Sequence, residues 1–88
     1  MDGRCYYVYV YFDPDTRTPI YVGKGKGVRY KIHMTYARTG KRNLRFHNKL
    51  RQYIVAGKEP VIEIVLKDLS ESVALDMERF IISQYKRL

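Results

Sequence analysis

Residues 5–11 (CYYVYVY) constrain the fold of this chain more than any other segment, because every residue after Cys5 is a tyrosine or a valine. Aromatic and β-branched side chains favour strands, where they pack well on a pleated surface. Successive side chains on a strand point to opposite sides. One side of this strand would carry Tyr7, Tyr9 and Tyr11, and the other side Tyr6, Val8 and Val10. The segment therefore predicts a strand with two faces available for packing.

A second strand is expected shortly after the first. Residues 13–16 (DPDT) are typical of a turn, and residues 18–22 (TPIYV) again have strand-forming composition. The two strands pair most simply as an antiparallel hairpin. Residues 23–27 (GKGKG) suit no regular element, so they are predicted to form a loop that leads into a helix.

Helical spacing begins after this glycine-rich segment. Val28, Ile32 and Tyr36 would share one stripe of a short helix over residues 28–37, which ends before Gly40. A second helix would then follow along the chain.

This second helix has Asn43 as its predicted N-cap and Gly57 as its end. Its apolar residues recur at helical spacing, at Phe46, Leu50, Tyr53 and Ile54. Residues 61–66 (VIEIVL) predict a third strand. Ser70 is expected to cap a last helix that runs to about Tyr85.

The resulting order, β-β-α-α-β-α with short connections, predicts an α+β fold: a small three-stranded, mostly antiparallel sheet flanked by helices. The 88 residues cannot divide a hydrophobic core in two, so we expect a single domain over residues 1–88. No apolar stretch approaches the ~20 residues needed to cross a bilayer, and the pattern of a signal peptide is absent. The single cysteine, Cys5, cannot form an internal disulfide. We therefore expect a cytoplasmic protein without a membrane partner, associated with the nucleoid, or nuclear if eukaryotic.

Basic residues are concentrated in the middle of the chain. The formal net charge is +8, and residues 16–58 contain twelve basic residues and no acidic one. Residues 59–85, by contrast, hold six acidic residues against two basic ones. A concentrated basic surface binds polyanions, because binding releases counterions condensed on a phosphate backbone. Nucleic acid is therefore the first partner to consider, although charge alone equally allows a solubilising surface.

Glu78 lies at an unexpected position in the last predicted helix. On a helical wheel it falls within an apolar arc formed by Val73, Ala74, Met77, Phe80, Ile81 and Tyr85 and extended by Leu75 and Ile82. Its carboxylate would point towards the sheet, where an unpaired charge is costly. Two interpretations stay open: a carboxylate at the core edge that pairs with an arginine or reaches water, and a metal ligand or catalytic carboxylate.

Two further groups could carry chemistry. Arg29 and His33 lie one helical turn apart and could reach the same point, one as a fixed cation and the other as a base near neutral pH. Such a pair is also common on solvated helix faces. Free N–H groups of residues 23–27 could hold phosphate, but their GxGxG pattern is not a P-loop and equally describes a flexible turn. Most tyrosines are expected to be half-buried with surface hydroxyls, and His47 is expected to be structural.

Taken in order, these features resemble the GIY-YIG nuclease superfamily. The residues that carry the resemblance are CYYVYVY, Ile20-Tyr21-Val22-Gly23, residues 24–29 (KGKGVR), His33 and Glu78. The YVGKGKG form, with an arginine close behind, is similar to the branch that includes the LEM-domain-associated nucleases and their bacterial and phage relatives. The resemblance covers nearly the whole chain and implies a GIY-YIG-like fold.

The resemblance also implies a metal-dependent DNA endonuclease that nicks a strand at a single site by hydrolysing a phosphodiester bond. Glu78 would hold one Mg²⁺ or Mn²⁺, and Arg29 would pair with phosphate oxygens. Tyr7, at the position of the GIY tyrosine, would be the general base, with a pKa lowered by the surrounding Lys and Arg charges. His33 is the rival base, and His33 and Tyr21 would orient water or phosphate.

DNA would be held by a set of basic residues along one groove: Lys24, Lys26, Lys31, Lys41, Arg42 and Arg45. The family usually has an asparagine after the glutamate helix, and none follows Glu78 here, so the domain is either truncated at its C-terminus or works without it. Two alternatives remain, a nucleic-acid-binding module with degraded catalysis and a basic protein-interaction domain. A protein partner or a homodimer could supply targeting.

Overall fold

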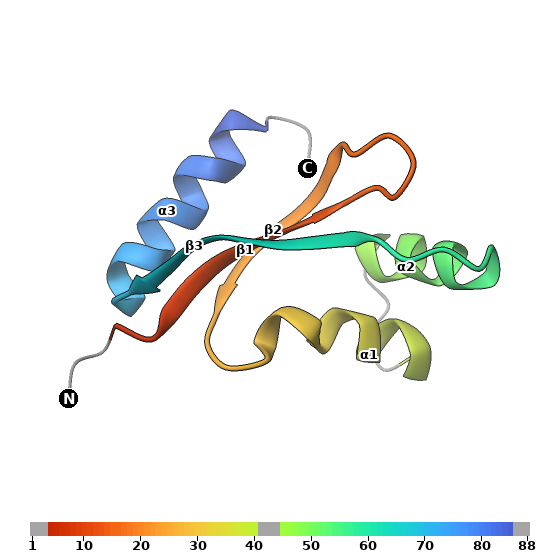
Figure 1. Cartoon of the computed structure of the whole chain (residues 1–88), viewed down its shortest axis with the longest axis horizontal. Helices are drawn as coiled ribbons and strands as arrows, with labels where there is room; N and C mark the ends of the chain where they lie inside the picture. Colours follow the sequence, from red (N-terminus) through yellow and green to blue (C-terminus); the bar gives the residue numbers. More distant parts are fainter. Residues whose placement is uncertain (1–3, 41–44, 86–88) are drawn as a thin grey trace.

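The computed structural model describes residues 4–40 and 45–85 and shows a three-stranded antiparallel sheet with helices on both faces (Figure 1). The strands are β1 (Tyr6–Phe12), β2 (Pro19–Gly25) and β3 (Val61–Leu69), in the spatial order β2-β1-β3. The helices are the 3-10 helix η1 (Arg29–Lys31), α1 (Ile32–Thr39), α2 (Arg45–Val55) and α3 (Glu71–Gln84). This architecture confirms the predicted α+β fold and its order of elements.

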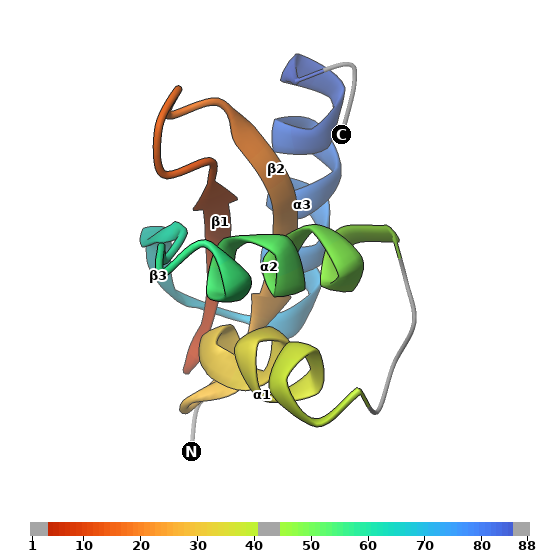
Figure 2. The same cartoon turned by 90° about the vertical axis from the view of Figure 1, so that its right-hand side faces the viewer.

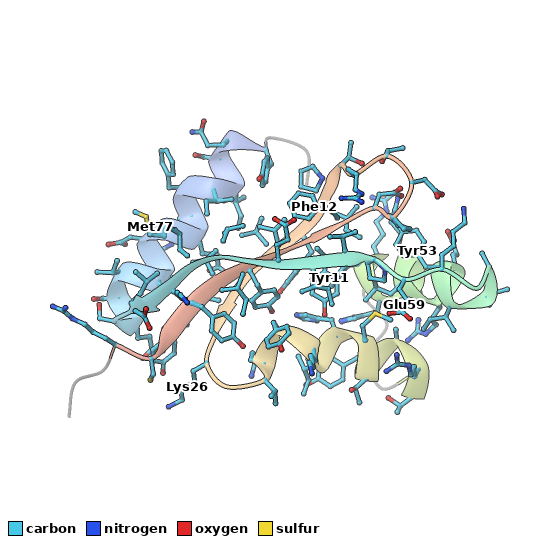
Figure 3. All side chains as sticks on the ribbon, in the orientation of Figure 1. Tyr11, Phe12, Lys26, Tyr53, Glu59 and Met77 are labelled. Atoms are coloured by element: carbon cyan, nitrogen blue, oxygen red, sulfur yellow. The ribbon has the colours of Figure 1, made fainter. Side chains whose placement is uncertain are left out.

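The two faces of β1 build two separate hydrophobic clusters, because its side chains alternate. Helices α1 and α2 cover one face of the sheet and α3 covers the other (Figures 1 and 2). Tyr7, Tyr9 and Tyr11 pack beneath α1 and α2, whereas Val8 and Val10 pack beneath α3. In Figure 3 the neighbouring residues Tyr11 and Phe12 point to opposite faces. Met77 of α3 packs against the same cluster as Phe12. The two-faced strand is thus confirmed, and it lies at the centre of the sheet.

The tyrosines of β1 are far more buried than the sequence predicted. Tyr7, Tyr9 and Tyr11 have at most 7% of their surface exposed, so the expectation of surface hydroxyls is wrong for them. Each hydroxyl finds a partner inside the protein: the Gly27 carbonyl at 2.8 Å for Tyr7, His33 Nε2 at 2.9 Å for Tyr9, and the Tyr30 carbonyl at 2.5 Å for Tyr11. Burial of a tyrosine is tolerated when its hydroxyl is hydrogen-bonded.

Asp13 fixes the turn between β1 and β2. Its Oδ1 accepts hydrogen bonds from the N–H groups of Asp15 at 2.8 Å and Thr16 at 2.9 Å, which is the turn chemistry that the sequence indicated. Its Oδ2 accepts a hydrogen bond from the Tyr53 hydroxyl at 2.7 Å, so the turn is also bonded to α2. Hydrogen bonds to the charged form, first those of the Thr16 N–H and the Tyr53 hydroxyl, lower the pKa of Asp13 to about 2.

The glycine-rich segment is not the loop that its composition predicted. β2 continues through Gly23, Lys24 and Gly25, which pair with Tyr9, Val8 and Tyr7 of β1. Pairing with the well-packed central strand outweighs the low strand propensity of glycine. The turn begins only after Gly25, and Gly27 adopts a positive φ of 62° there.

The first helix is also divided differently from the expectation. Residues 28–37 were predicted as one helix, whereas the structure has η1 followed by α1, which ends at Gly40 in the left-handed conformation. The stripe predicted from Val28 is wrong, because Val28 is 71% exposed. The buried residues are His33, Met34 and Ala37, so α1 presents a neighbouring face to the sheet.

The remaining elements follow the sequence more closely. α2 ends before Gly57, which has the positive φ expected of a helix-ending glycine, while the predicted N-cap Asn43 lies outside the described residues. β3 is three residues longer than residues 61–66, and Ser70 caps α3 by accepting the Val73 N–H. The predicted apolar arc of α3 is only partly buried, since three of its residues are exposed: Val73, Phe80 and Ile82. No helix in the described part of the chain is long and apolar enough to cross a membrane.

Candidate active site

A cavity of about 300 Å³ lies where the strands meet η1, α1 and α3. Its lining residues are Tyr9, Tyr21, Lys24, Arg29, His33, Tyr36 and Glu78, and we call it the Glu78 pocket. They come from β1, β2, η1, α1 and α3, which are spread over most of the chain. Five of them were singled out from the sequence: Tyr21, Lys24, Arg29, His33 and Glu78. The fold therefore brings these predicted residues together around one cavity.

Three hydrogen-bonded side chains run from the Glu78 pocket into the core. Tyr9 Oη lies 2.9 Å from His33 Nε2, and His33 Nδ1 lies 3.0 Å from His47 Nε2. The three residues are 1%, 8% and 0% exposed. A neutral imidazole carries a single N–H, so a Tyr9 hydroxyl that donates to Nε2 makes His33 Nδ1 the donor to His47. Desolvation by burial raises the pKa of Tyr9 well above its ordinary value, so this hydroxyl remains protonated at neutral pH.

Aromatic rings form one wall of the pocket. The Tyr21 ring stacks on Phe46 of α2, with centroids 4.4 Å apart and planes 6° apart. It also lies 4.6 Å from the His33 ring, edge to face. These contacts hold Tyr21 and His33 in fixed orientations, because both rings are packed rather than extended into solvent.

Gly23 is required by the close approach of Tyr9. A Cβ at position 23 would lie 2.5 Å from Tyr9 Oη and 2.6 Å from its Cζ, well inside van der Waals contact. At Gly25 a Cβ would lie 2.6 Å from the Cβ of Arg29. The glycines of the strand end thus leave room for the two side chains that enter the pocket from β1 and η1.

We expect Gly23→Ala to lower the stability of the protein by about 1–3 kcal/mol, because the buried Tyr9 ring must move to make room. The same substitution at Gly25 should also destabilise, because a Cβ there would lie 2.6 Å from the Cβ of Arg29, an atom that rotation of the side chain cannot move. Urea unfolding of both variants measures the two losses. An unchanged stability of Gly23→Ala would contradict the role assigned to Gly23.

Glu78 is half-buried, and its environment disfavours its charge. Desolvation by burial raises the pKa of Glu78, against a lowering by the Lys24 and Arg79 charges and by a hydrogen bond from the Lys24 main-chain N–H. No ion pair joins Glu78 to an arginine within residues 4–40 and 45–85. The interpretation of Glu78 as the partner of an arginine therefore lacks support here, and its carboxylate faces the pocket.

The cations of the pocket come from Lys24 and Arg29. Lys24 Nζ lies 3.5 Å from Glu71 Oε2 at the surface, where the Glu71 side chain is largely exposed. A solvent-exposed pair at this distance is weak, so Lys24 can turn to another anion at little cost. Arg29 is exposed and is the first residue of η1. Together they give the pocket two positive groups beside one carboxylate.

Tyr7 does not line this pocket. Its hydroxyl donates to the Gly27 carbonyl at 2.8 Å and accepts the Tyr30 N–H at 3.0 Å. The predicted lowering of its pKa is wrong: desolvation by burial raises the pKa of Tyr7, and this outweighs the nearby Arg29 charge. Among the tyrosines of β1, Tyr9 lines the pocket, two residues further along the same face of the strand.

The predicted DNA-binding residues are dispersed. Lys24 lines the Glu78 pocket, and Lys26 and Lys31 lie exposed near the rings of Tyr6 and Tyr30. Arg45 lines a different and larger groove. Lys41 and Arg42 lie outside the described residues.

Three residues of the site were not predicted from the sequence: Tyr9, Tyr36 and His47. Tyr9 had only a shared signal, since a hairpin of residues 5–11 with residues 18–25 places Tyr9 opposite Gly23 and Tyr7 opposite Gly25. His47 had none, because its partner His33 is fourteen positions away on another helix. Pairing between two helices depends on tertiary packing that periodicity does not show.

The donor set limits what kind of metal site is possible. No group of three or more His, Cys, Asp and Glu side chains that could hold a metal ion occurs in the part of the chain that the structure describes. A closed site made of protein ligands is therefore not built from these residues. A single carboxylate suits Mg²⁺ instead, because this ion keeps several waters and is often held by one or two carboxylates together with substrate phosphates.

Protein-family models, curated proteins and solved structures give no match to this chain. The chemistry must therefore be inferred from the pocket itself. Two cations can bind a phosphate, a half-buried carboxylate can hold a hard cation, and a hydrogen-bonded Tyr9–His33 pair can move a proton. Together these groups are suited to hydrolysis of a phosphate ester.

Proposed function

We propose that this protein is a metal-dependent DNA endonuclease of the GIY-YIG type, which nicks a strand at a single site by hydrolysing a phosphodiester bond. The observation that carries the proposal is the meeting of Tyr21, Arg29, His33 and Glu78 around one cavity. Arg29, His33 and Glu78 were selected from the sequence for their chemistry, and Tyr21 through the family resemblance. The basic middle segment of the chain, with a net charge of +8 overall, supports DNA as the partner.

Arg29 and Lys24 bind the scissile phosphate in this proposal. A guanidinium can donate two parallel hydrogen bonds to two non-bridging oxygens, and these bonds strengthen as negative charge develops in the transition state. Lys24 adds a positive charge near the same oxygens. Tyr21, held by its stacking on Phe46, limits where the phosphate can lie.

Tyr9 and His33 supply the base as a pair. An anionic tyrosine is disfavoured here because burial raises the pKa of Tyr9. The hydroxyl can instead accept a proton from water while it gives its own proton to His33 Nε2, 2.9 Å away. His47 orients His33 through the bond to Nδ1 and is a positioning residue. Tyr7 fits this role less well, because its hydroxyl is bonded to two main-chain groups outside the pocket.

Glu78 is the residue that would hold Mg²⁺ or Mn²⁺. The bound ion would polarise the phosphate and neutralise the leaving oxygen. The half-buried carboxylate faces the pocket beside the phosphate-binding cations, which is where an ion shared with a phosphate must lie.

The proposal is tested by nicking of supercoiled plasmid. We expect conversion of supercoiled to open-circular DNA with Mg²⁺ or Mn²⁺ and none with EDTA. A preparation that binds DNA but never nicks it under these conditions would favour the second candidate, a nucleic-acid-binding module on the same fold. The burial of the Tyr7 and Tyr9 hydroxyls favours this binding module, since burial raises the pKa of both and disfavours a tyrosine anion that could act as the base.

A substitution at His47 tests the positioning role separately. His47→Leu removes the partner of His33 Nδ1, and we expect nicking to fall roughly 10-fold or more, as is typical when an orienting group is lost. His47→Gln keeps a hydrogen-bonding group at this place and should restore part of the rate. The pH profile of nicking should also shift in His47→Leu, because its His33 no longer shares a proton with a second imidazole. A rate loss that only follows lost stability, with an unchanged pH profile, would contradict the role.

A further inference from the structure

A second groove lies beside the Glu78 pocket and shares Tyr21 with it. It has a volume of about 930 Å³ and runs between β2 and α2, with Ile82 of α3 at one side. β2 is at the edge of the described sheet, so the groove is open along this strand. Figure 2 shows α2 crossing the face of the sheet near β2, with α3 behind. We call it the β2–α2 groove.

The polar lining of the β2–α2 groove favours an anionic ligand. Arg45 and Lys49 line it from successive turns of α2, and both are exposed. Asn48 and Gln52 add two amides from the same helix. No carboxylate is among the described residues that line the groove. Charge complementarity therefore points to a chain of phosphates rather than to a basic partner.

The apolar lining of the β2–α2 groove favours a ligand that also has flat apolar surfaces. Tyr21 and Phe46 form a stacked aromatic pair at the junction with the Glu78 pocket, and Pro19, Ile20 and Ile82 supply aliphatic surface. Flat apolar surfaces bind the faces of bases, and amides can bind base edges. In a duplex the base faces are covered by stacking, so only an unpaired strand offers both its bases and its phosphates to one groove.

We propose that the β2–α2 groove binds an unpaired segment of a nucleic-acid strand, whose next phosphate occupies the Glu78 pocket. The position of that phosphate rests on the proposed function, whereas the groove stands on its own lining. The proposal names a substrate class: DNA that has a single-stranded segment beside the point of cleavage.

Binding of a labelled oligothymidine to the full chain, in EDTA so that no cleavage occurs, tests the groove. We expect tighter binding of the oligothymidine than of a duplex of equal length at the same salt concentration. Lys49→Ala should weaken this binding several-fold and reduce the salt slope by about 0.7, the value for one phosphate of a single strand. The matched control is Lys67→Ala, an exposed lysine of β3 at the opposite edge of the sheet, which should bind as the unchanged protein does.

Crosslinking locates the bound strand independently of affinity. Irradiation of a bromodeoxyuridine oligonucleotide should attach it to Tyr21 or Phe46 if bases enter the groove. Melting curves followed by circular dichroism show whether each variant is folded. Equal losses in Lys49→Ala and Lys67→Ala, binding of the duplex at least as tight as that of the single strand, or capture of a poly-glutamate peptide in place of the oligonucleotide would each overturn the proposal.

The two proposals can fail separately. Oligothymidine binding in EDTA without any nicking in Mg²⁺ would keep the groove and remove the nuclease. Nicking without a preference for the unpaired strand would keep the nuclease and remove the proposed role of the groove.

Discussion

Replacement of Arg29 by alanine is expected to abolish nicking, with a loss of about 1,000-fold or more, while the protein remains folded. The loss is large because the guanidinium binds phosphate oxygens whose charge grows in the transition state. Stability should change little, since Arg29 is exposed and makes no ion pair with Glu78 within the described residues. Nicking rates, DNA affinity and melting temperature are measured on the same preparation.

Two further variants define the role of Arg29. Arg29→Lys keeps the charge but loses the paired donors, so it should recover only a small part of the rate. Arg38→Ala is the matched control, because Arg38 is an exposed arginine of α1 that does not line the pocket. An Arg29→Ala protein that unfolds, or that nicks at the rate of Arg38→Ala, would remove Arg29 from the site.

Elements with a strong local signal were predictable from the sequence. The alternation in residues 5–11 predicted both faces of β1, and Ser70 caps α3 as predicted. The glycine-rich end of β2 was not predictable in the same way, because glycine has low strand propensity and the strand is maintained by pairing with β1. Local composition misleads where a neighbouring strand supplies the hydrogen bonds.

The residues of the candidate site also differ in whether a local sequence signal identified them. Arg29, His33 and Glu78 each stood out through their own position in a helix or turn, and the fold places all three at one cavity. The tyrosine could not be chosen from its own neighbourhood, because Tyr7 and Tyr9 share a face of β1 and differ only in what lies above them. Gly27 and Tyr30 engage Tyr7, whereas His33 engages Tyr9. That difference is made by α1 and the turn before it.

For Glu78, a metal-binding role and a structural role predict opposite changes in stability. Glu78→Gln keeps the size of the side chain and removes its charge. As a metal ligand, Glu78 should be indispensable, so Mg²⁺-dependent nicking should disappear while the melting temperature stays level or rises. As one member of a buried ion pair, its loss would leave the other member uncompensated and cost about 3–5 kcal/mol. Asp76→Asn is the matched control, since Asp76 is an exposed carboxylate on the same helix.

The pH dependence of stability gives this test a second readout. Burial raises the pKa of Glu78 in the folded protein, so the folded state binds the proton more tightly than the unfolded chain does. Stability must then fall as pH rises from the ordinary glutamate pKa of 4.5 through the raised folded value, and the penalty is complete above it. In metal-free buffer, Glu78→Gln should therefore gain stability over the unchanged protein at neutral pH and lose that gain below about pH 4.5. A variant that still nicks DNA and melts much earlier would place Glu78 in the scaffold, and the nuclease proposal would lose its metal ligand.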